Sequence, residues 1–347
     1  MNDRNIEEIA AETPGSLGGL VNEAIRHDFD YITSAENLFV AWERFRRGKR
    51  GRADVQAFEP HLEANIFDLS DRLRRGQYRH SPYQPFTIHD PKQRQINKAT
   101  VVDRLVHQAV VQVIEPLYER GFIYDSYSCR VGKGTHVAID RLRTFLRRAS
   151  RNDAQTVYAL KLDIRKFFAN VDHDILIGLL KRKIVDPDTI NLMREIIDSF
   201  SSDAGRGIPL GNLTSQLFAN IYLHELDWHI KQQIRFDYYL RYCDDFIFVS
   251  TNREALLEQI EPIQDFLTTY LRLQIHPDKI HLRSWQQGID FLGYVLKPDC
   301  TLVRTKTRLR MLSRLEETNL TSYLGVCSHA DSFELQLSLH NNLWLNI

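Results

Sequence analysis

The sequence lacks any run of 18 or more apolar residues, and this excludes a membrane-spanning helix. It has only 4 cysteines, far apart and without a CxxC pair, which argues against a structural zinc site and a disulfide framework. The first thirty residues carry acidic side chains throughout and no apolar core, so they do not resemble a secretion signal. These absences predict a protein of a reducing cytoplasm, without a membrane partner.

The charge of the chain is balanced overall but unevenly distributed. Its 347 residues, 43% hydrophobic and 26% charged, are typical of a soluble globular protein with two or three subdomains. Residues 1–40 hold 8 acidic and 2 basic side chains, residues 41–150 hold 12 and 21, and residues 151–300 hold 21 and 17. A basic segment before an acidic one suits a protein that grips a polyanion with one part and binds cations with another. Charge alone favours the simpler interpretation of an ordinary charged surface.

The first half of the chain is mainly helical by its apolar spacing. Leu62, Ile66, Leu69 and Leu73, for example, follow each other at steps of 4, 3 and 4 residues. Helices are expected at residues 36–47, 58–75, 100–119 and 135–149. Three prolines within residues 77–98 instead favour short strands or a hairpin.

The middle of the chain mixes strands with helices. Residues 156–163 alternate as in a strand that ends at Asp163, and two apolar runs, 238–242 and 246–249, flank Cys-Asp-Asp as the arms of a hairpin. Further helices are expected at 173–184, 189–200, 212–231 and 253–271, and further strands near 279–284 and 289–297. This order predicts an α+β fold in which helices pack on one face of a mostly antiparallel sheet.

Three carboxylates stand out in this pattern. Asp163 ends an apolar strand, and Asp244 and Asp245 occupy the tip of a hairpin with apolar arms. Burying adjacent carboxylates is costly unless a cation compensates their charge. If the strand end faces the hairpin tip, the three side chains would hold two magnesium ions suited to phosphoryl transfer. An isolated Asp-Asp pair is better explained as turn chemistry in a surface hairpin, so the neighbouring motifs must decide.

These motifs resemble those of reverse transcriptases. Residues 161–173 (KLDIRKFFANVDH) are similar to the family's first catalytic palm motif, and residues 241–250 (RYCDDFIFVS) to its Tyr-x-Asp-Asp box. Residues 207–227 resemble the segment between these two motifs. Residues 92–110 and 123–140 resemble the two fingers motifs of the family, and residues 275–282 and 289–296 resemble its last two palm motifs. The resemblance runs in the family's order from about 85 to 297.

The resemblance implies a right-hand polymerase with helical and β fingers, a palm of antiparallel sheet backed by helices, and a short helical thumb. The expected domains are an N-terminal extension (1–50), fingers (51–155), palm (156–298) and thumb (299–347). Whether residues 174–206 form a fingers insertion stays open. The implied activity is synthesis of cDNA on an RNA template from deoxynucleoside triphosphates.

The resemblance also assigns the metal and catalytic residues. Asp163, Asp244 and Asp245, with the carbonyl of Ile164, would ligate two Mg²⁺ ions, for which Mn²⁺ is an alternative. Lys279 matches a lysine near the leaving pyrophosphate, where it would act as a general acid. The three aspartates and Lys279 are therefore the predicted catalytic residues.

Nucleotide and primer contacts follow from the same resemblance. Phe168 takes the position of the aromatic ring that excludes a ribose 2′-hydroxyl, with a core phenylalanine as the alternative. Lys92 and Arg94 match finger residues that grip the triphosphate, although a solvated loop also explains them. The other implied contacts are Leu210, Gly211 and Gln216 with the nucleotide, and Gly132, Lys133, Leu292 and Gly293 with primer and template. Leu292 and Gly293 match the turn that grips the primer end, with a plain strand as the alternative.

One departure from the usual family pattern concerns residue 210. Many members have Pro-Gln-Gly where this chain has Pro209-Leu210-Gly211, and Ser215-Gln216 follows. Leucine cannot donate a hydrogen bond to the incoming nucleotide, so selection of the nucleotide should relax. This form resembles the reverse transcriptases of bacterial diversity-generating retroelements, which copy a template RNA with frequent errors opposite adenine. Those enzymes work with a small basic accessory protein, and the resemblance implies the same partner here.

Two other interpretations remain. A retron-type or defence-associated reverse transcriptase would share the catalytic core and differ in template and partner. A catalytically inactive palm kept as an RNA-binding scaffold is less favoured, because all three aspartates are present. Residues 301–347 begin as a helix with basic side chains that would meet the phosphates of the template–primer duplex, unless they form an ordinary solvated face.

Overall fold

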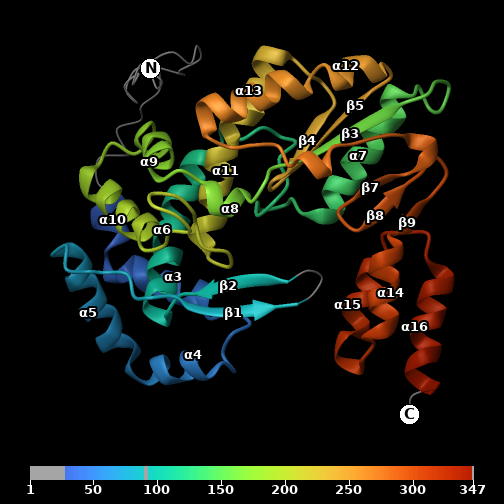
Figure 1. The fold of residues 1–347 in the computed structure, drawn as a ribbon. Helices are drawn as coiled ribbons and strands as arrows, with labels where there is room; N and C mark the ends of the chain where they lie inside the picture. Colours follow the sequence, from blue (N-terminus) through green and yellow to red (C-terminus); the bar gives the residue numbers. More distant parts are fainter. Residues whose placement is uncertain (1–27, 90–92, 346–347) are drawn as a thin grey trace. The chain divides into compact units, whose positions relative to one another are not determined.

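The chain forms two compact units in the computed structural model, which describes residues 28–89 and 93–345. The first unit comprises Met1–Ile123, Arg165–Leu226 and Phe266–Gln274, and the second comprises Tyr124–Ile164, Asp227–Asp265 and Ile275–Ile347. Figure 1 follows both units by sequence colour. Across the described ranges, the helices are all too short or too polar to cross a bilayer.

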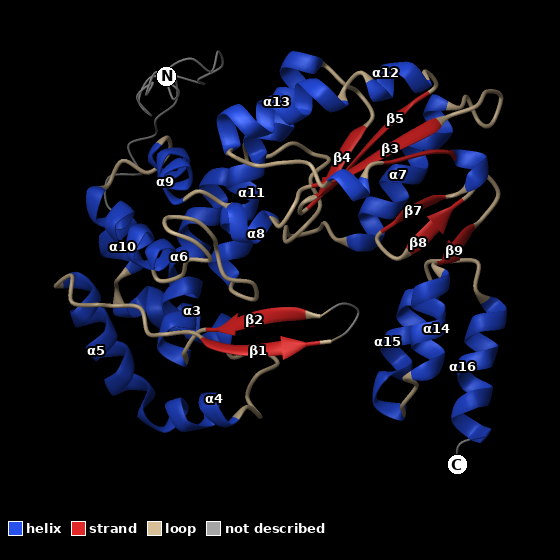
Figure 2. Ribbon diagram, in the orientation of Figure 1, coloured by secondary structure: helices blue, strands red, loops and turns tan. Residues whose placement is uncertain are grey.

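The first unit is mainly helical, as Figure 2 shows. Its helices are α2 (Asp28–Ile32), α3 (Ala35–Phe45), α4 (Ala53–Phe58), α5 (Leu62–Arg74), α6 (Val101–Glu119), α8 (Phe167–Asn170), α9 (His173–Lys181), α10 (Pro187–Asp198) and most of α11 (Leu213–Trp228). A short 3-10 helix, Glu59–His61, joins α4 to α5. Strands β1 (Gln84–Ile88) and β2 (Arg94–Lys98) pair antiparallel, so the predicted hairpin is confirmed.

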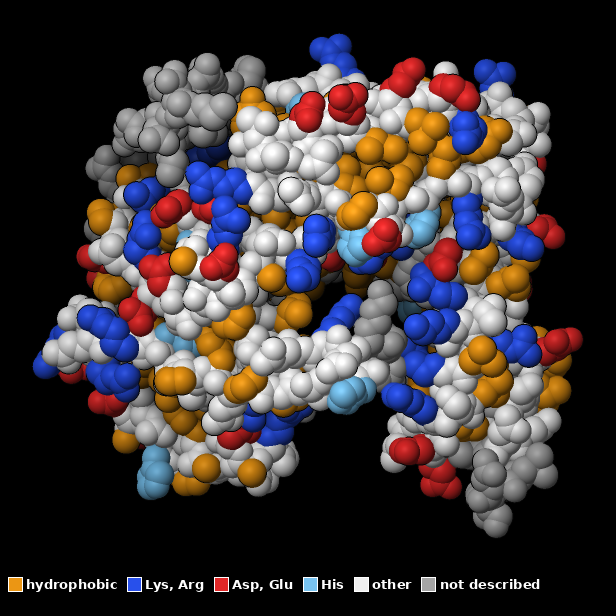
Figure 3. Space-filling view, viewed as in Figure 1, with side chains coloured by type: hydrophobic (Ala, Val, Ile, Leu, Met, Phe, Trp, Pro, Cys, Tyr) orange, Lys and Arg blue, Asp and Glu red, His pale blue; other side chains and the backbone are white. Residues whose placement is uncertain are grey.

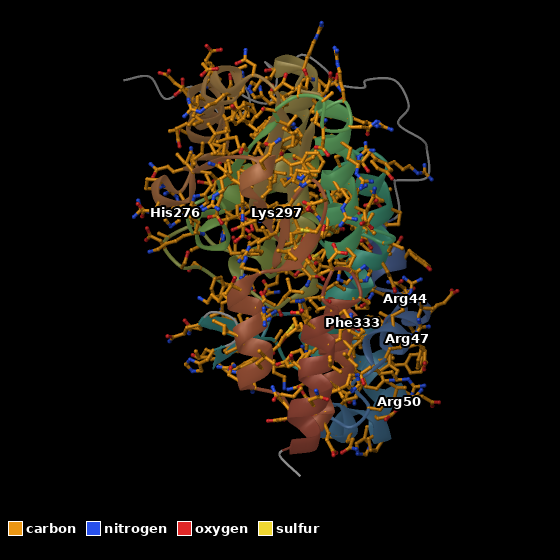
Figure 4. The ribbon with its side chains drawn as sticks, turned by 90° about the vertical axis from the view of Figure 1, so that its right-hand side faces the viewer. Arg44, Arg47, Arg50, His276, Lys297 and Phe333 are labelled. Atoms are coloured by element: carbon orange, nitrogen blue, oxygen red, sulfur yellow. The ribbon has the colours of Figure 1, made fainter. Side chains whose placement is uncertain are left out.

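Polar caps and an apolar interface explain the long helices of this unit. The side chain of Thr100 accepts a hydrogen bond from the backbone of Asp103 at the start of α6, and Asp172 caps α9 in the same way. Helix α3 packs against α6, with Leu38 and Trp42 fully buried. The basic run at the end of α3 instead faces solvent, and Figure 4 labels its exposed arginines, Arg44, Arg47 and Arg50.

The second unit is built on antiparallel sheets. A four-stranded sheet has the order β4 (Tyr239–Tyr242), β5 (Asp245–Ser250), β3 (Tyr158–Asp163), β6 (His281–Ser284). A three-stranded sheet contains β7 (Ile289–Phe291), β8 (Tyr294–Leu296) and β9 (Thr301–Val303). The helices are α7 (Thr135–Ala149), α12 (Arg253–Leu257), α13 (Ile260–Leu271, which ends in the first unit), α14 (Thr305–Ser313), α15 (Glu317–Cys327) and α16 (Phe333–Leu345). A π-helix follows α11, at His229–Ile234.

The four-stranded sheet is held by apolar side chains on its central strands. Leu160 and Leu162 on β3, and Phe246 and Phe248 on β5, are fully buried. Helix α7 packs against β4 and β5, and α12 packs against β3 and β5. Burial of these strands favours their register, because a slip of one residue would turn Lys161 of β3 toward the positions that Leu160 and Leu162 occupy.

Most predicted elements are present, and the α+β fold class is confirmed. Helix α7 has the predicted bounds, and the β4–β5 hairpin carries the Asp-Asp pair at its turn. The single strand predicted at 289–297 is wrong, because Leu292 and Gly293 both adopt positive φ and fold it into the β7–β8 hairpin. The single helix predicted at 253–271 is divided into α12 and α13.

The C-terminal residues are more helical than their sequence pattern indicates. Three helices, α14 to α16, follow β9 where one helix was predicted at the start of the segment. Figure 3 shows basic side chains gathered over this region, and α14 and its flanks contribute Arg304, Lys306, Arg308, Arg310 and Arg314. The predicted domain limits at 51, 156 and 299 stay predictions.

Candidate active site

The end of strand β3 places Asp163 within the second unit. The backbone carbonyl of Asp163 accepts a hydrogen bond from His276 N at 2.8 Å, and Asp163 is only 7% exposed. Asp163 lies directly opposite Asp245 in the β3–β5 register. Directly opposed residues of an antiparallel pair have Cβ atoms about 5 Å apart, so the two carboxylates share one small region.

The β4–β5 turn adds the third carboxylate. It consists of Cys243 and Asp244, between the paired residues Tyr242 and Asp245. Ile164 N donates a hydrogen bond to the carbonyl oxygen of Asp244 at 3.2 Å, which ties the turn to the end of β3. The sequence prediction that a strand end faces an acidic hairpin tip is therefore realised in the fold.

Mutual repulsion and burial perturb these carboxyl groups. Burial, followed by the nearby charges of Asp163 and Asp245, raises the pKa of Asp244 to about 6. Burial is also the main cause of the raised pKa of Asp245, which Lys161 partly offsets. A cluster of this kind favours any cation that neutralises it.

Two lysines neutralise part of this negative charge. Lys279 Nζ lies 2.6 Å from Asp163 Oδ1, and Lys161 Nζ lies 3.4 Å from Asp245 Oδ1. Lys279 ends a 3-10 helix, Pro277–Lys279, whose start is held to β3 by the hydrogen bond of His276. The proximity of Lys279 to the carboxylates agrees with its predicted catalytic position.

The donor chemistry of this cluster fits a hard divalent cation. Carboxylate oxygens are the ligands that Mg²⁺ and Mn²⁺ prefer, and one or two of them suffice when substrate phosphates complete the coordination. Within the described residues, no group of three or more His, Cys, Asp and Glu side chains is arranged so that it could hold a metal ion as it stands. The lysine ammonium groups contact Asp163 Oδ1 and Asp245 Oδ1, so a bound ion would share these two carboxylates with Lys279 and Lys161.

The predicted nucleotide-binding residues that the structure describes belong to the first unit. The carbonyl oxygen of Leu210 accepts a hydrogen bond from Asn97 N at 3.2 Å, which places Leu210 beside β2. Gly211 has a φ of +100°, and a Cβ there would lie 2.7 Å from Ile96 Cγ2, so glycine is required. Arg94 lies exposed on the same strand β2.

Two further predicted nucleotide-binding residues are Gln216 and Lys92. Gln216 is exposed in the first turn of α11, whose start follows Gly211 in the chain. Lys92 falls outside the described residues. The roles assigned to these residues stay predictions.

The predicted primer and template residues lie in the second unit. Leu292 and Gly293 form the β7–β8 turn, with φ of 49° and 93°. Gly132 has a φ of 71° in the turn before α7. Lys133 Nζ donates to the carbonyl of Tyr124 at 2.9 Å and lies 3.4 Å from the centre of its ring, so this lysine folds back on its own loop.

Sequence patterns missed several charged residues that lie at or beside the carboxylate cluster. Lys161 occupies β3 two residues before Asp163. A lysine within an otherwise apolar strand is the one sequence feature that could indicate an acidic partner for it. A buried ion pair of Arg241 with Asp227 also lies next to the turn. Arg241 and Asp227 each lie in an otherwise apolar segment, and nothing in the sequence predicts that their side chains form an ion pair.

An antiparallel sheet that presents three carboxylates at a strand end and an adjoining hairpin turn is the palm arrangement of a nucleic-acid polymerase. The family model described as "Reverse transcriptase (RNA-dependent DNA polymerase)" matches residues 88–296. The chain therefore belongs to the reverse transcriptase family of RNA-directed DNA polymerases, whose fold is the predicted right-hand polymerase. Members of this family generally depend on divalent metal ions.

Two curated relatives and one solved structure illustrate the extent of the similarity. Protein YkfC of Escherichia coli K12 is 24% identical over 308 residues, which cover 76% of this chain and 79% of YkfC. The group II intron-encoded protein LtrA of Lactococcus lactis is 27% identical over 231 residues, or 62% of this chain but only 37% of LtrA. Apo telomerase from Candida tropicalis aligns with a TM-score of 0.49 and 13% identity, over 63% of this chain and 48% of that chain. The family membership rests on the match of the family model to residues 88–296, and the retroelement subtype stays a prediction.

Phe168→Ala is expected to weaken selection against ribonucleotides. Phe168 is half-buried, its ring lies 5.2 Å from that of Phe167, and its carbonyl accepts from Ile208 N at 2.8 Å. If its ring excludes a 2′-hydroxyl, removal of the ring should lower the ratio of kcat/KM for dNTP over rNTP about tenfold. Primer extension with matched dNTP and rNTP measures this ratio.

Phe167→Leu provides the matched control for this experiment. Phe167 is only 1% exposed, so its truncation should lower the melting temperature and leave sugar selection intact. An unchanged ratio in the Phe168 variant would show that Phe168 is a packing residue.

Proposed function

We propose that the chain synthesises cDNA on an RNA template by phosphoryl transfer assisted by two divalent metal ions, Mg²⁺ or alternatively Mn²⁺. The observation that carries this proposal is the convergence of Asp163, Asp244 and Asp245 at the β3 end and the β4–β5 turn. These carboxylates would hold the ions, with the carbonyl of Ile164 as a further ligand. The bound ions supply positive charge to the reacting phosphate oxygens.

The other proposed roles belong to side chains of the chain itself. Lys279, 2.6 Å from Asp163, holds the proton that would pass to the leaving pyrophosphate. Arg94 binds two triphosphate oxygens through a bidentate contact, and Lys92 binds the triphosphate by its positive charge. Phe168 excludes the ribose hydroxyl, and the Leu292–Gly293 turn contacts the primer end.

We further propose that the enzyme is the error-prone polymerase of a diversity-generating retroelement. Support comes from Leu210, which lies beside β2 and has no amide with which to read the incoming nucleotide. The near-neutral charge of the chain, with 45 basic and 45 acidic side chains, suits a small basic accessory protein that would supply further contacts with RNA.

A second candidate is favoured by the relatives. LtrA is a group II intron-encoded protein, and its similarity makes an intron-type reverse transcriptase the main competitor. Since the chain spans 37% of LtrA, that candidate covers polymerisation alone. Both candidates share the catalytic cluster and differ in the RNA that is copied.

Sequencing of cDNA made by the purified protein on its co-purifying RNA separates the two candidates. Frequent misincorporation opposite adenine in one RNA is expected for the retroelement enzyme, whereas accurate copies of an intron RNA would support the competitor. No cDNA with RNA template, dNTP and Mg²⁺ or Mn²⁺, with or without an accessory protein, would contradict the polymerase activity and favour an RNA-binding scaffold.

Leu210→Gln is expected to lower the error frequency opposite adenine. The new amide would donate a hydrogen bond to the correctly placed nucleotide, and such a bond contributes about 1 kcal/mol, or about fivefold in selection. Sequencing of cDNA from an adenine-rich template measures the change. Leu210→Met, of similar size and without an amide, serves as control and should keep the parental error frequency. Equal error frequencies in all three proteins would remove Leu210 from the explanation.

A further inference from the structure

A completely buried ion pair lies next to the catalytic turn. Arg241 on β4 and Asp227 at the end of α11 both have side chains with 0% exposure. Arg241 Nε donates to Asp227 Oδ1 at 2.8 Å, and Nη2 donates to Oδ2 at 2.7 Å. The hydroxyl of Tyr239 also donates to Oδ1, at 2.7 Å. These contacts fix the plane of the guanidinium group.

The remaining arm of this guanidinium group reaches the turn. Arg241 Nη1 donates to the carbonyl oxygen of Cys243 at 3.0 Å. The next carbonyl, that of Asp244, accepts from Ile164 N at 3.2 Å. Two consecutive carbonyls of the turn are therefore held, one by Arg241 and one by the strand end that carries Asp163.

The turn needs such support because its backbone is strained. Cys243 has a φ of 55°, in the left-handed region where hairpin turns normally place glycine or asparagine. A side chain in this conformation persists only where its surroundings over-determine it. The hydrogen bond from Arg241 acts on the peptide that links Cys243 to Asp244.

Arg241 is itself anchored on its outer side. Its backbone N–H donates to the carbonyl of Asp125 and its carbonyl accepts from Tyr127 N, both at 2.9 Å. Nη2 also donates to Ser126 Oγ at 3.1 Å. The segment before α7 thus extends the sheet beyond β4 and limits movement of the arginine.

Stability alone is a poor reason to bury this pair. Well-packed apolar side chains of similar volume commonly stabilise a protein as much as or more than a buried ion pair. A buried ion pair is better explained where it orients a neighbouring group. Here Arg241 Nη1, which does not contact Asp227, donates to the carbonyl of Cys243, the residue before Asp244.

We propose that Arg241 and Asp227 are positioning residues that hold the Cys243–Asp244 turn so that the Asp244 carboxylate meets those of Asp163 and Asp245. This inference rests on the proposed role of the three carboxylates as ligands of divalent cations. Asp227 orients Arg241, and Arg241 orients the turn.

The test replaces the polar cluster with apolar side chains. The triple variant Asp227→Leu, Tyr239→Phe, Arg241→Met removes the ion pair. It includes Tyr239→Phe because the Tyr239 hydroxyl would otherwise be buried without the Asp227 carboxylate that accepts its hydrogen bond. We expect a melting temperature close to that of the parent, weaker Mn²⁺ binding in electron paramagnetic resonance titrations, and a higher half-saturating Mg²⁺ concentration. We also expect kcat to fall at least about tenfold, because small displacements of catalytic groups are costly, while affinity for the template RNA is unchanged.

A conservative variant and a matched control complete the experiment. Arg241→Lys keeps a positive charge but loses the planar fork, so it should show the same changes at smaller size. The control Arg182→Met with Glu225→Leu removes an ion pair of 2.9 Å that joins the end of α9 to α11, and should leave Mn²⁺ binding unchanged.

Parental Mn²⁺ binding and Mg²⁺ dependence in both Arg241 variants would overturn the positioning role. Failure of Arg241→Lys to fold would also overturn it, because the pair would then be a requirement of the fold. If the parent protein lacks polymerase activity, the proposed function fails, and the Mn²⁺ comparison still decides whether Arg241 positions the turn.

Discussion

Asp244→Asn should abolish RNA-templated DNA synthesis and at the same time stabilise the metal-free protein. Activity is lost because the amide removes the negative charge that a divalent cation requires at the β4–β5 turn. Stability rises because burial and the charges of Asp163 and Asp245 disfavour the ionised Asp244 in the folded state. The pKa of about 6, against 3.8 normally, corresponds to about 3 kcal/mol of unfolding free energy.

The pH dependence of stability follows from the same shift. The pKa of Asp244 is higher in the folded than in the unfolded state, so the folded protein binds this proton first. The contribution to stability is complete below pH 3.8 and is lost as the pH rises through about 6. The stabilising effect of Asp244→Asn should therefore be largest above pH 6 and disappear near pH 4.

Thermal unfolding in chelator at several pH values, together with primer extension at saturating Mg²⁺, checks both parts of this prediction. Asp237→Asn is a suitable control, because Asp237 precedes β4 and lies outside the carboxylate cluster. Full-rate synthesis by the Asp244 variant would contradict its role as a metal ligand. An equal loss of stability at all pH values would contradict the electrostatic explanation.

Lys279→Met is expected to lower kcat about 100-fold, within the range typical for removal of a general acid. Lys279 Nζ lies 2.6 Å from Asp163 Oδ1, so the side chain is placed at the carboxylates that would hold the metal ions. Single-turnover primer extension measures the chemical step, and the KM for dNTP should change much less than kcat.

Lys279→Arg separates proton transfer from charge. Arginine keeps the positive charge beside Asp163, but it does not release a proton near neutral pH. A general-acid role predicts that the arginine variant is as slow as the methionine variant. Recovery of the parental rate by arginine would assign Lys279 an electrostatic role instead, and parental kcat in the methionine variant would exclude both roles.

Local sequence patterns were sufficient for most elements of the fold. The spacing of apolar residues gave α7 its bounds of Thr135–Ala149, and the apolar arms around Cys-Asp-Asp gave the β4–β5 hairpin. These two predictions are correct because the periodicity of a helix or strand depends on residues that are close together in the chain. The apolar pattern of residues 289–297 did not reveal the turn at Leu292 and Gly293, which only the family resemblance implied, because leucine rarely adopts a positive φ.

The candidate site was predicted in part for the same reason. Motif resemblance predicts the three aspartates and Lys279 as site residues, whereas no local pattern indicates Lys161 or the pair of Arg241 with Asp227. Charged residues within apolar segments are usually exposed or paired, and the sequence does not name the partner. Arg241 was part of the recognised Tyr-x-Asp-Asp box, yet its contact with Cys243 depends on the folded turn.

The sequence by itself determined the family, the α+β pattern and the identity of the acidic residues, because each is a property of short segments with their own spacing. The tertiary structure decided which of these segments meet. Asp163 and Asp245 become neighbours only through the register of β3 and β5, which burial of both strands selects. The pKa of Asp244 and the support from Arg241 are likewise consequences of groups brought together from separate segments, because burial and electrostatic interaction depend on distance in space.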